Sequence, residues 1–374
     1  MKKYRVGIIG FAHMHINNVA GIYGEHPQVE FVACSDTVPA IPELREAPYT
    51  RTWNIKNVMK NQGITKFYDD YNEMLDKEKF DIIICCSENA KHPDIVEACA
   101  KSGVNVCVEK PMAMSYEHAW RMVRACQLNG TTMMINWPLT WSPTAHKAKT
   151  HIDEGVIGRV LQMKWRAGHT GPLGPGAAHA GVSETADSMS GAERSATWWH
   201  QSSAGGGAML DFCCYGAMVS RWYIGEQAIS AVGMKANLDS QWGDADDNGA
   251  MIVRFPNAMC MLEGTWTTWD HGIPGGPIVY GTKGTLVVDS INGKPVVRLE
   301  KGHGQRTIYE PDPLLENRHQ ASWEFIHHLE TGKPLHPTVE MTFNLEVMAI
   351  LDAGVRSAKS GKMETVNSVH WQNQ

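Results

Sequence analysis

Short apolar runs alternate with helix-like stretches along the first third of the chain. The apolar runs cover residues 4–9, 29–34, 81–86 and 105–108, and a helical pattern begins near Ile16. Strands that alternate with helices predict a parallel sheet whose crossover connections are right-handed. Ligands of such sheets bind beyond the carboxyl ends of the strands, so the residues that follow each run are the first candidates for a binding site.

Polar or glycine residues follow all of these runs. They are Gly10 after the first run, Asp36 after the second, Ser87, Glu88 and Asn89 after the third, and Glu109 and Lys110 after the fourth. We therefore expect these residues to meet at one edge of the sheet.

The rest of the chain predicts a second domain that is rich in strands. Strand patterns separated by turn residues cover 160–166, 230–236, 249–255, 258–265 and 284–288, and helical patterns return at 318–329 and 342–359. A chain of 374 residues is long enough for two domains. We place the boundary near Ile135, which gives domains of residues 1–135 and 136–374. No spacer rich in Ser, Gly or Pro lies there, so we expect no flexible linker.

Charge and cysteine usage narrow the range of partners. The formal net charge of −6 disfavours nucleic acid and anionic membranes, because both need a basic face. No stretch approaches the roughly 20 apolar residues of a membrane helix, and the start after Met-Lys-Lys lacks the apolar run of a signal peptide. The nine cysteines form no C-x-x-C pair, which favours free thiols in a reducing compartment. We expect a small-molecule partner and a cytoplasmic location.

The turn after the first apolar run resembles the dinucleotide-binding fingerprint G-x-G-x-x-G. Glycines in this motif let the backbone approach a pyrophosphate at a helix N-terminus. Gly10 takes the first glycine position, Ala12 the second and His15 the third, so only the tight-turn glycine is kept. We expect the cofactor to contact the whole turn, which consists of Gly10, Phe11, Ala12, His13 and Met14.

Asp36 supports the same interpretation. An acid at the end of the second strand accepts hydrogen bonds from the ribose hydroxyls of NAD and repels the 2′-phosphate of NADP. NAD is therefore the expected cofactor, with NADP disfavoured. The alternative is that Asp36 only caps the helix that follows.

Motifs in a fixed order along nearly the whole chain resemble the Gfo/Idh/MocA family of oxidoreductases. They are Ser87-Glu-Asn-x-x-His92, Glu109-Lys-Pro111, Asp153-Glu-Gly155-x-x-Gly158, Gly205-Gly-Gly-Ala-Met-Leu-Asp211, Tyr280-Gly-Thr-Lys-Gly284 and Ser357-x-x-x-Gly361. The resemblance implies a Rossmann domain followed by a domain with a large open, mostly antiparallel sheet. It also implies that such sheets pair face to face in a homodimer or homotetramer.

The resemblance further implies an acid/base group at the reacting carbon. Oxidation of a secondary alcohol removes the hydroxyl proton as hydride leaves for the nicotinamide. Lys110 would stabilise the developing alkoxide, Tyr215 would act as acid/base, and Asp211 would orient the substrate hydroxyl or the tyrosine. Asp211 and Tyr215 are four residues apart, so on a helix they share one face.

Many members of the family have histidine where this chain has Tyr215. The tyrosine resembles the glucose–fructose oxidoreductase and dihydrodiol dehydrogenase branch, in which it is taken as the acid/base. A phenol needs a lowered pKa for that role, and we expect the ammonium of Lys110 to lower the pKa of Tyr215. The alternative is a core tyrosine packed in its helix.

Further contacts are expected from the same resemblance. Glu109 and His92 would lie near the cofactor, as would Trp137, which we expect to open the strand that enters the second domain. The family carries arginine or tyrosine where Trp137-Pro-Leu stands, so no substrate contact is inferred there.

Residues 168–206 are rich in Gly, Ala, Ser and His, and we expect them to arch over the active site. Aromatic rings with polar neighbours suit the apolar face and the hydroxyl rim of a sugar. The candidate substrate contacts are Lys110, His169, His179, Trp199, His200 and Asp211. Lone histidines in loops are more often solvated, which is the alternative for His169 and His179.

His13 and His15 raise the question of a metal site. An H-x-H pair without a clustered carboxylate or cysteine is a weak metal motif, and the resembled family uses no metal. The sequence therefore predicts no metal, with His13 near the cofactor.

Together these patterns predict an NAD-dependent oxidoreductase that oxidises a secondary hydroxyl of a sugar, glycoside or cyclic polyol, with ring carbon 3 as a candidate position. Two alternatives keep the cofactor bound: a hydride shuttle between two sugars, and glycoside cleavage by oxidation and elimination with recycled NAD(P). An alternative of another class is a catalytically silent sensor of nucleotide or sugar, which the incomplete glycine fingerprint favours. Fold alone does not decide among them.

Overall fold

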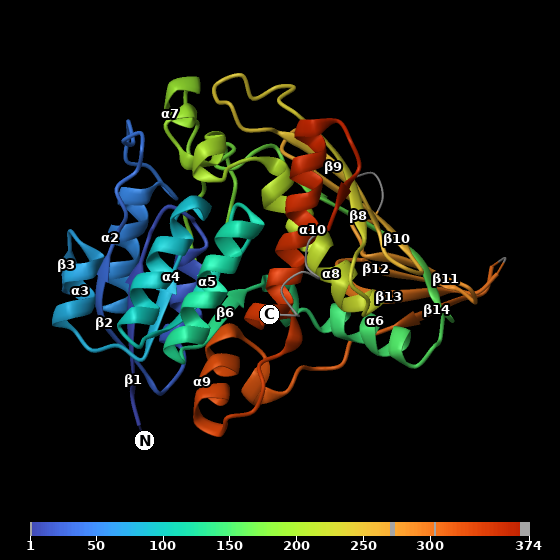
Figure 1. Cartoon of the computed structure of the whole chain (residues 1–374), viewed down its shortest axis with the longest axis horizontal. Helices are drawn as coiled ribbons and strands as arrows, with labels where there is room; N and C mark the ends of the chain where they lie inside the picture. Colours follow the sequence, from blue (N-terminus) through green and yellow to red (C-terminus); the bar gives the residue numbers. More distant parts are fainter. Residues whose placement is uncertain (1, 270–273, 303, 367–374) are drawn as a thin grey trace.

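Two β-sheets organise the computed structural model of the chain, which describes residues 2–269, 274–302 and 304–366 (Figure 1). Among these residues the first sheet has six parallel strands in the order β3-β2-β1-β4-β5-β6. The strands are β1 (Tyr4–Ile9), β2 (Val29–Ser35), β3 (Phe67–Tyr68), β4 (Ile82–Cys85), β5 (Asn105–Glu109) and β6 (Met133–Asn136). The predicted strands are confirmed, and β3 and β6 extend the sheet at its two edges.

The helices of this first region lie between its strands in sequence. They are α1 (Ile16–Gly24), α2 (Arg51–Gln62), α3 (Tyr71–Lys77), α4 (His92–Lys101) and α5 (Tyr116–Asn129). All four residues of β4 are apolar and buried, which is the pattern of a central strand covered on both faces. The alternation of strand and helix therefore produces the Rossmann-type layering that the sequence predicts.

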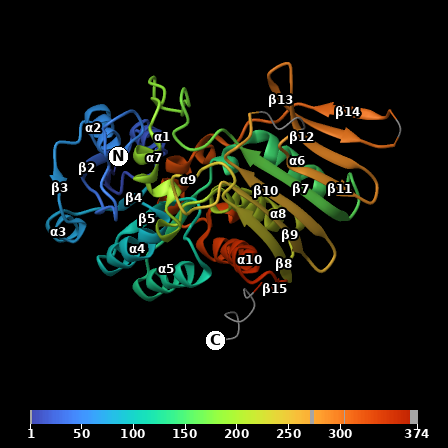
Figure 2. The same ribbon diagram turned by 90° about the horizontal axis from the view of Figure 1, so that it is seen from above.

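The second sheet is open and mostly antiparallel, as expected (Figure 2). Within the described residues it has nine strands in the order β14-β13-β12-β11-β7-β10-β9-β8-β15, and β7 and β10 are its parallel pair. The strands are β7 (Val160–Gly168), β8 (Ser230–Ala236), β9 (Asn248–Arg254), β10 (Met259–Thr265), β11 (Ile278–Gly281), β12 (Thr285–Ile291), β13 (Lys294–Glu300), β14 (Arg306–Tyr309) and β15 (Glu364–Thr365).

The sequence predicts five of these strands and misses β11, β13, β14 and β15. The strands β11 and β14 have four residues each and β15 has two, which is too short for a readable two-residue alternation. Pro295 near the start of β13 also weakens its strand pattern. The missed strands therefore complete a larger sheet than the apolar pattern indicates.

Three helices of the second region pack on this sheet, namely α6 (Pro143–Asp153), α8 (Cys214–Ile224) and α10 (Met341–Ser360). Two further helices, α7 (Gly191–Ser195) and α9 (Ala321–Thr331), lie away from it. Ser357 of α10 accepts the backbone N–H of Gly233 on β8 at 2.9 Å, so α10 lies directly on the sheet. Helix α10 also contacts α5, while α9 contacts α1 (Figure 2). The end of the chain therefore returns to the first sheet.

The region between the two sheets corrects one expectation. Trp137 does not open a strand, because β6 ends at Asn136 and the chain turns into a 3₁₀ turn at Pro138–Trp141. Pro138 has no backbone N–H to donate to a ladder, which explains why the strand stops. The predicted domain boundary at residue 135 lies within β6 and stays a prediction.

The outer face of the second sheet is the surface on which the expected pairing of subunits depends. The outer face of the second sheet exposes a row of apolar side chains, namely Val232, Met234, Ile252, Met259 and Met261. Pairing of this face in a homodimer or homotetramer stays a prediction.

The nine cysteines are all buried and free of disulfides. No helix in the part of the chain that the structure describes is long and apolar enough to cross a membrane.

Candidate active site

The turn after β1 is held tightly against the loop after β4. Gly10 has a φ of +96°, and a Cβ on this residue would lie 2.6 Å from the backbone nitrogen of Ser87. Only glycine fits both constraints. Gly10 is therefore a genuine fingerprint glycine, and the turn leads into α1 with Ala12 as a small, buried second position.

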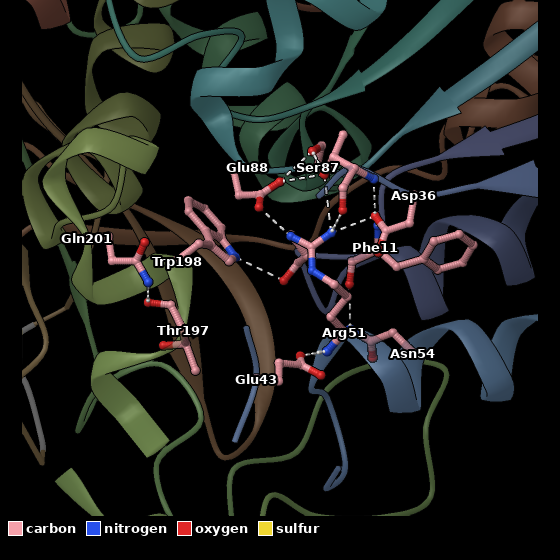
Figure 3. Close-up of polar contacts among 12 residues, drawn as sticks. Phe11, Asp36, Glu43, Arg51, Asn54, Ser87, Glu88, Thr197, Trp198 and Gln201 are labelled. Atoms are coloured by element: carbon pink, nitrogen blue, oxygen red, sulfur yellow. Dashed lines mark hydrogen bonds and ion pairs between the residues drawn. The ribbon is translucent and has the colours of Figure 1, made fainter. Parts of the chain in front are cut away.

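An ion-pair network closes the edge of the sheet beside this turn (Figure 3). Arg51, in the first turn of α2, places Nη1 2.6 Å from Oδ1 of Asp36 and donates through Nη2 to Glu88. The same Oδ1 accepts the backbone N–H groups of Phe11 at 3.0 Å and Thr37 at 2.8 Å. Burial raises the pKa of Asp36 above its ordinary value, although Arg51 works in the opposite direction.

The network rules out the helix-capping alternative for Asp36 and adds Arg51 to the candidate site. Asp36 does not cap α2, because that helix begins at Arg51 after Thr50. Arg51 was not predicted, because nothing in the sequence pattern links it to an acid fifteen positions earlier. Ser87 and Glu88 join the network through Thr37, whose Oγ lies 2.9 Å from Ser87 Oγ and from Glu88 Oε2.

A long segment, residues 169–206, crosses from β7 over this edge, and we call it the strap (Figure 1). Trp198 Nε1 donates to the carbonyl oxygen of Ala12 at 2.9 Å. Arg45 donates to Glu193 at 2.7 Å, to Asp187 at 3.2 Å and to the carbonyl of Ser188 at 2.8 Å. A cavity of about 220 Å³ remains between the strap and the edge of the sheet, lined by residues that include Ala12, Arg51, Glu88, Trp198 and Trp199.

The glycine run at the end of the strap packs on the loop after β4. Gly205 has a φ of +83°, and a Cβ there would lie 2.7 Å from the Cβ of Asn89. Asn89 Nδ2 donates to the carbonyl of Gly205 at 2.8 Å. This contact aligns the run with the first sheet and places the next residues, Met209–Cys213, beside Lys110.

Lys110 and Asp211 form a buried ion pair. Lys110 Nζ lies 2.6 Å from Asp211 Oδ1, and Trp266 Nε1 donates to Asp211 Oδ2 at 3.1 Å. Burial alone would raise the pKa of Asp211, but Lys110 and His169 bring it below its ordinary value. Burial likewise opposes the charge of Lys110, yet Asp211 and Tyr215 hold the pKa of Lys110 well above its ordinary value. Both groups are therefore charged at neutral pH.

Tyr215 completes this group in a way that differs from the expectation. Asp211 lies in a π-helical turn and Tyr215 is the second residue of α8, yet both line one cavity of about 420 Å³. Lys110 Nζ lies 4.9 Å from the centre of the Tyr215 ring, so it contacts the ring face. Burial raises the pKa of Tyr215 above its ordinary value and outweighs the lowering by Lys110. The prediction of a lowered phenol pKa is wrong in its net direction.

The predicted substrate residues divide into two sets. His169, His179 and Trp199 line the 420 Å³ cavity together with Lys110, Asp211 and Tyr215. His200 does not line it, because its ring lies among Trp266 and Trp242 at ring-centre distances of 5.5 and 5.6 Å. Burial lowers the pKa of His200 to about 4. Its position therefore favours a structural role over contact with a substrate.

His92 and Trp137 contact the loops and the ring that line the cavity, and neither is among the residues that line it. His92 is fully buried, and its two ring nitrogens lie 3.0 Å from the carbonyl of Met112 and 3.3 Å from that of Ser87. Trp137 Nε1 donates to Asn344 at 2.7 Å, and the Trp137 ring lies edge-on to Tyr215 at 5.4 Å. Both residues thus fix the loops and rings that face the cavity.

The loop after β1 meets the end of β5 at a second polar cluster. His15 Nδ1 lies 3.0 Å from Glu109 Oε1, and Asn136 donates to Glu109 Oε2 at 2.8 Å. The assumption that no carboxylate lies near His13 and His15 is therefore wrong, because the fold brings β5 beside the turn. His13, His15 and Met14 line the same cavity as Lys110.

Comparison with known proteins agrees with this geometry. Residues 4–137 match the family described as an oxidoreductase family with an NAD-binding Rossmann fold, and residues 145–287 match the GFO/IDH/MocA C-terminal domain. The chain belongs to the Gfo/Idh/MocA family of oxidoreductases. The expected fold and enzyme class are therefore confirmed.

Three proteins match nearly the whole chain at low sequence identity. The myo-inositol 2-dehydrogenase of Thermotoga maritima is 22% identical over 342 residues, or 88% of this chain and 89% of that protein. The structure of aldose–aldose oxidoreductase from Caulobacter crescentus, complexed with glycerol, matches with a TM-score of 0.75 at 20% identity, covering 97% of this chain and 100% of the other. Levoglucosan dehydrogenase, in complex with NADH and levoglucosan, gives a TM-score of 0.73 at 20% identity, with 98% and 100% covered.

The edge of the first sheet fits the NAD of this family. Gly10 has no Cβ, so the turn can pack closely against Ser87. Helix α1 begins a few residues after Gly10, and its N-terminus is suited to bind a pyrophosphate. Asp36 directly follows β2, at the place where a carboxylate accepts hydrogen bonds from the ribose hydroxyls of the cofactor. These residues, with Arg51 and Glu88, would hold the adenosine half of the cofactor.

Proposed function

We propose that this protein is an NAD-dependent dehydrogenase that oxidises a secondary hydroxyl of a sugar, a glycoside or a cyclic polyol. The observation that carries the proposal is the buried Lys110–Asp211 pair beside Tyr215, in a cavity next to the glycine turn. Relatives whose names include inositol and levoglucosan dehydrogenases support this class of substrate.

When bound, NAD supplies the acceptor for the hydride that leaves the substrate carbon. Lys110 carries a positive charge at the position where an alkoxide would develop, and Asp211 holds that ammonium in place. Tyr215 is a neutral phenol that can donate a hydrogen bond to the substrate oxygen and can pass the hydroxyl proton onward. The substrate would thus lose a hydride to the cofactor, and its hydroxyl proton would pass to the Tyr215 oxygen as the phenol gives its own proton to the carboxylate of Asp211, which is the base of this group.

The walls of the cavity suit a polyhydroxylated ring. Trp199, Phe212 and Leu173 offer apolar surface, while His169 and His179 offer hydrogen-bonding nitrogens. Sugar sites commonly combine such surfaces, because the ring faces are apolar and the rim carries hydroxyls. Lys110, His169, His179, Trp199 and Asp211 are therefore the proposed substrate contacts.

The strap favours a second candidate function. It crosses the cofactor edge and is fixed there by Trp198 and Arg45, so a bound cofactor would leave slowly. Slow release suits a hydride shuttle between two sugars, or glycoside cleavage by oxidation and elimination with NAD(P) recycled in each cycle. Either reaction would use the same Lys110, Asp211 and Tyr215 groups.

The test is the absorbance of reduced nicotinamide when the purified protein meets monosaccharides, glycosides and inositols, with and without added NAD. We expect a signal that Lys110→Met abolishes and that Lys101→Met, an exposed lysine at the end of α4, leaves unchanged. Product analysis would then give the oxidised carbon, including ring carbon 3. Turnover without added NAD would favour the second candidate, and a signal that survives in Lys110→Met would contradict both.

A further inference from the structure

Two histidines and one carboxylate from separate segments meet beside the cavity. His13 and His15 come from the turn after β1, and Glu109 comes from the end of β5. One potential ligand atom from each residue lies within 4.8 Å of the other two, and His15 Nδ1 is 3.0 Å from Glu109 Oε1. The proposed hydride transfer assigns no chemistry to this cluster.

A buried nitrogen without a partner lies in the same cluster. His13 is 1% exposed, and its Nδ1 accepts the backbone N–H of His15 at 3.1 Å. Its other ring nitrogen, Nε2, is buried and has no hydrogen-bond partner among the described residues. Buried polar atoms are nearly always satisfied, so a free imidazole nitrogen beside a cavity indicates a missing ligand.

We propose that His13, His15 and Glu109 bind one divalent transition-metal ion, for which Zn²⁺ is the best match. Two imidazole nitrogens and one carboxylate oxygen are a known set for catalytic zinc, which keeps a further position open. Zinc bonds of about 2.0–2.2 Å need ligand atoms roughly 3.3–3.6 Å apart. The three atoms now lie within 4.8 Å of one another, so they would have to move closer together when the ion binds.

The surroundings supply what a metal site requires beyond its ligands. Asn136 donates to Glu109 Oε2 at 2.8 Å and so orients the carboxylate, as outer partners of metal ligands do. The ammonium of Lys110 is paired with Asp211, which leaves Glu109 to balance the charge of a cation. His179 lines the same cavity, its ring centre is 6.2 Å from that of His15, and its Nε2 is also buried without a partner. His179 is therefore the nearest candidate for a fourth ligand.

A competing explanation is a direct contact between His15 and Glu109 without any metal. It accounts for the 3.0 Å contact but leaves Nε2 of His13 and Nε2 of His179 unexplained. A metal accounts for all of these atoms. The one position that the three ligands leave open would face the cavity, where either Nε2 of His179 or an oxygen of the substrate could bind.

Cobalt binding tests the proposal without turnover, so its outcome is separate from that of the dehydrogenase assay. The full-length protein is stripped with a chelator and titrated with Co²⁺, which gives visible absorption bands when held by nitrogen and oxygen ligands. We expect one ion per chain, displaced by Zn²⁺. His13→Ala, His15→Ala and Glu109→Gln should remove the bands, and Asn136→Ala should weaken binding about 10- to 100-fold.

The matched control is His327→Ala, which removes a histidine of α9 far along the chain and should bind Co²⁺ like the parent protein. Thermal unfolding of each variant without metal shows whether it is folded, and Asn136→Ala, which keeps all three ligands, guards against loss of a folded site. Absence of bands in the parent protein overturns the proposal. Equal binding by the three ligand variants also overturns it, because the ion would then lie elsewhere.

Discussion

Lys110 Nζ lies 2.6 Å from Asp211 Oδ1, and this pair joins the end of β5 to the π-helical turn that precedes α8. A buried ion pair therefore links the two regions of the chain at the proposed reaction centre. Trp266, which follows β10, donates to the other oxygen of Asp211 and adds a third segment to the junction. Small changes here should affect both stability and chemistry.

Asp211→Asn should reduce both properties. The substitution leaves the Lys110 ammonium buried without its counter-ion, a change that typically costs about 3–5 kcal/mol of unfolding free energy. We expect a lower denaturation midpoint together with a large fall in kcat. Chemical denaturation and steady-state kinetics check this, with Asp312→Asn, an exposed acid, as the control. Unchanged stability would mean that the pair is not formed.

Tyr215→Phe should slow the reaction while leaving substrate binding nearly intact. Loss of a proton-transfer group lowers kcat by roughly 10²- to 10⁴-fold. The ring contact with Trp137 and the Lys110 contact on the ring face are kept in phenylalanine, so KM should change little. Tyr280→Phe, on β11, is the control. A fall in kcat of less than about tenfold would exclude Tyr215 as the acid/base.

Asp36→Ser should change the cofactor preference. The guanidinium of Arg51 now lies against Asp36, and removal of the carboxylate frees it for the 2′-phosphate of NADP. We expect the ratio of kcat/KM for NADP to that for NAD to rise at least about tenfold, or about 1.4 kcal/mol. Asp69→Ser removes a charge near the same edge and should leave the ratio unchanged. Adding Arg51→Ala to Asp36→Ser should abolish the gain.

Arg45→Ala should loosen the strap and speed the release of NAD. Arg45 makes its contacts with Glu193, Asp187 and Ser188 near the surface, where an ion pair contributes about 0.2–1 kcal/mol. We therefore expect dissociation up to about fivefold faster, measured by displacement of bound NADH in a stopped-flow instrument. Arg306→Ala, which removes an ion pair on β14, is the control. An unchanged rate would show that the strap does not retain the cofactor.

Acid should destabilise the fold through His200. Burial, assisted by Arg194, lowers the pKa of His200 to about 4, while an unfolded histidine titrates near 6.5. The contribution of neutral His200 to the free energy of unfolding is therefore complete above about pH 6.5 and is lost as the pH falls toward 4, because the unfolded chain takes up the proton at a higher pH than the folded chain. His200→Gln should flatten this part of the melting-temperature profile, and His327→Gln should not. Parallel profiles for His200→Gln and the parent protein would contradict the prediction.

Strand-end chemistry was predictable from the sequence because parallel strands all end at one edge. Gly10, Asp36, Glu88 and Lys110 were found in this way, since each follows an apolar run. The contact between Glu109 and His15 was not, because it depends on how far the turn after β1 leans toward β5. A spacing of two residues between histidines says nothing about a carboxylate that is 94 positions away.

The contacts of Arg51 and the raised pKa of Tyr215 could not be predicted from the sequence for a related reason. Arg51 reaches Asp36 and Glu88 only because the loop before α2 folds back onto the sheet. The raised pKa of Tyr215 depends on complete burial, which a motif does not specify. Sequence patterns therefore located the elements and the strand-end residues, while long-range packing set the charges and the partners.

The strap connects the turn proposed for the nucleotide to the cavity proposed for the substrate. Trp198 is bonded to the turn that would receive the nucleotide, and its neighbour Trp199 lines the cavity proposed for the substrate together with His179. One segment of the chain thus covers the nucleotide turn and walls the substrate cavity. Because the strap would have to lift for the nucleotide to exchange, we expect that exchange to disturb the substrate cavity as well, so that the affinities for the two ligands are thermodynamically linked.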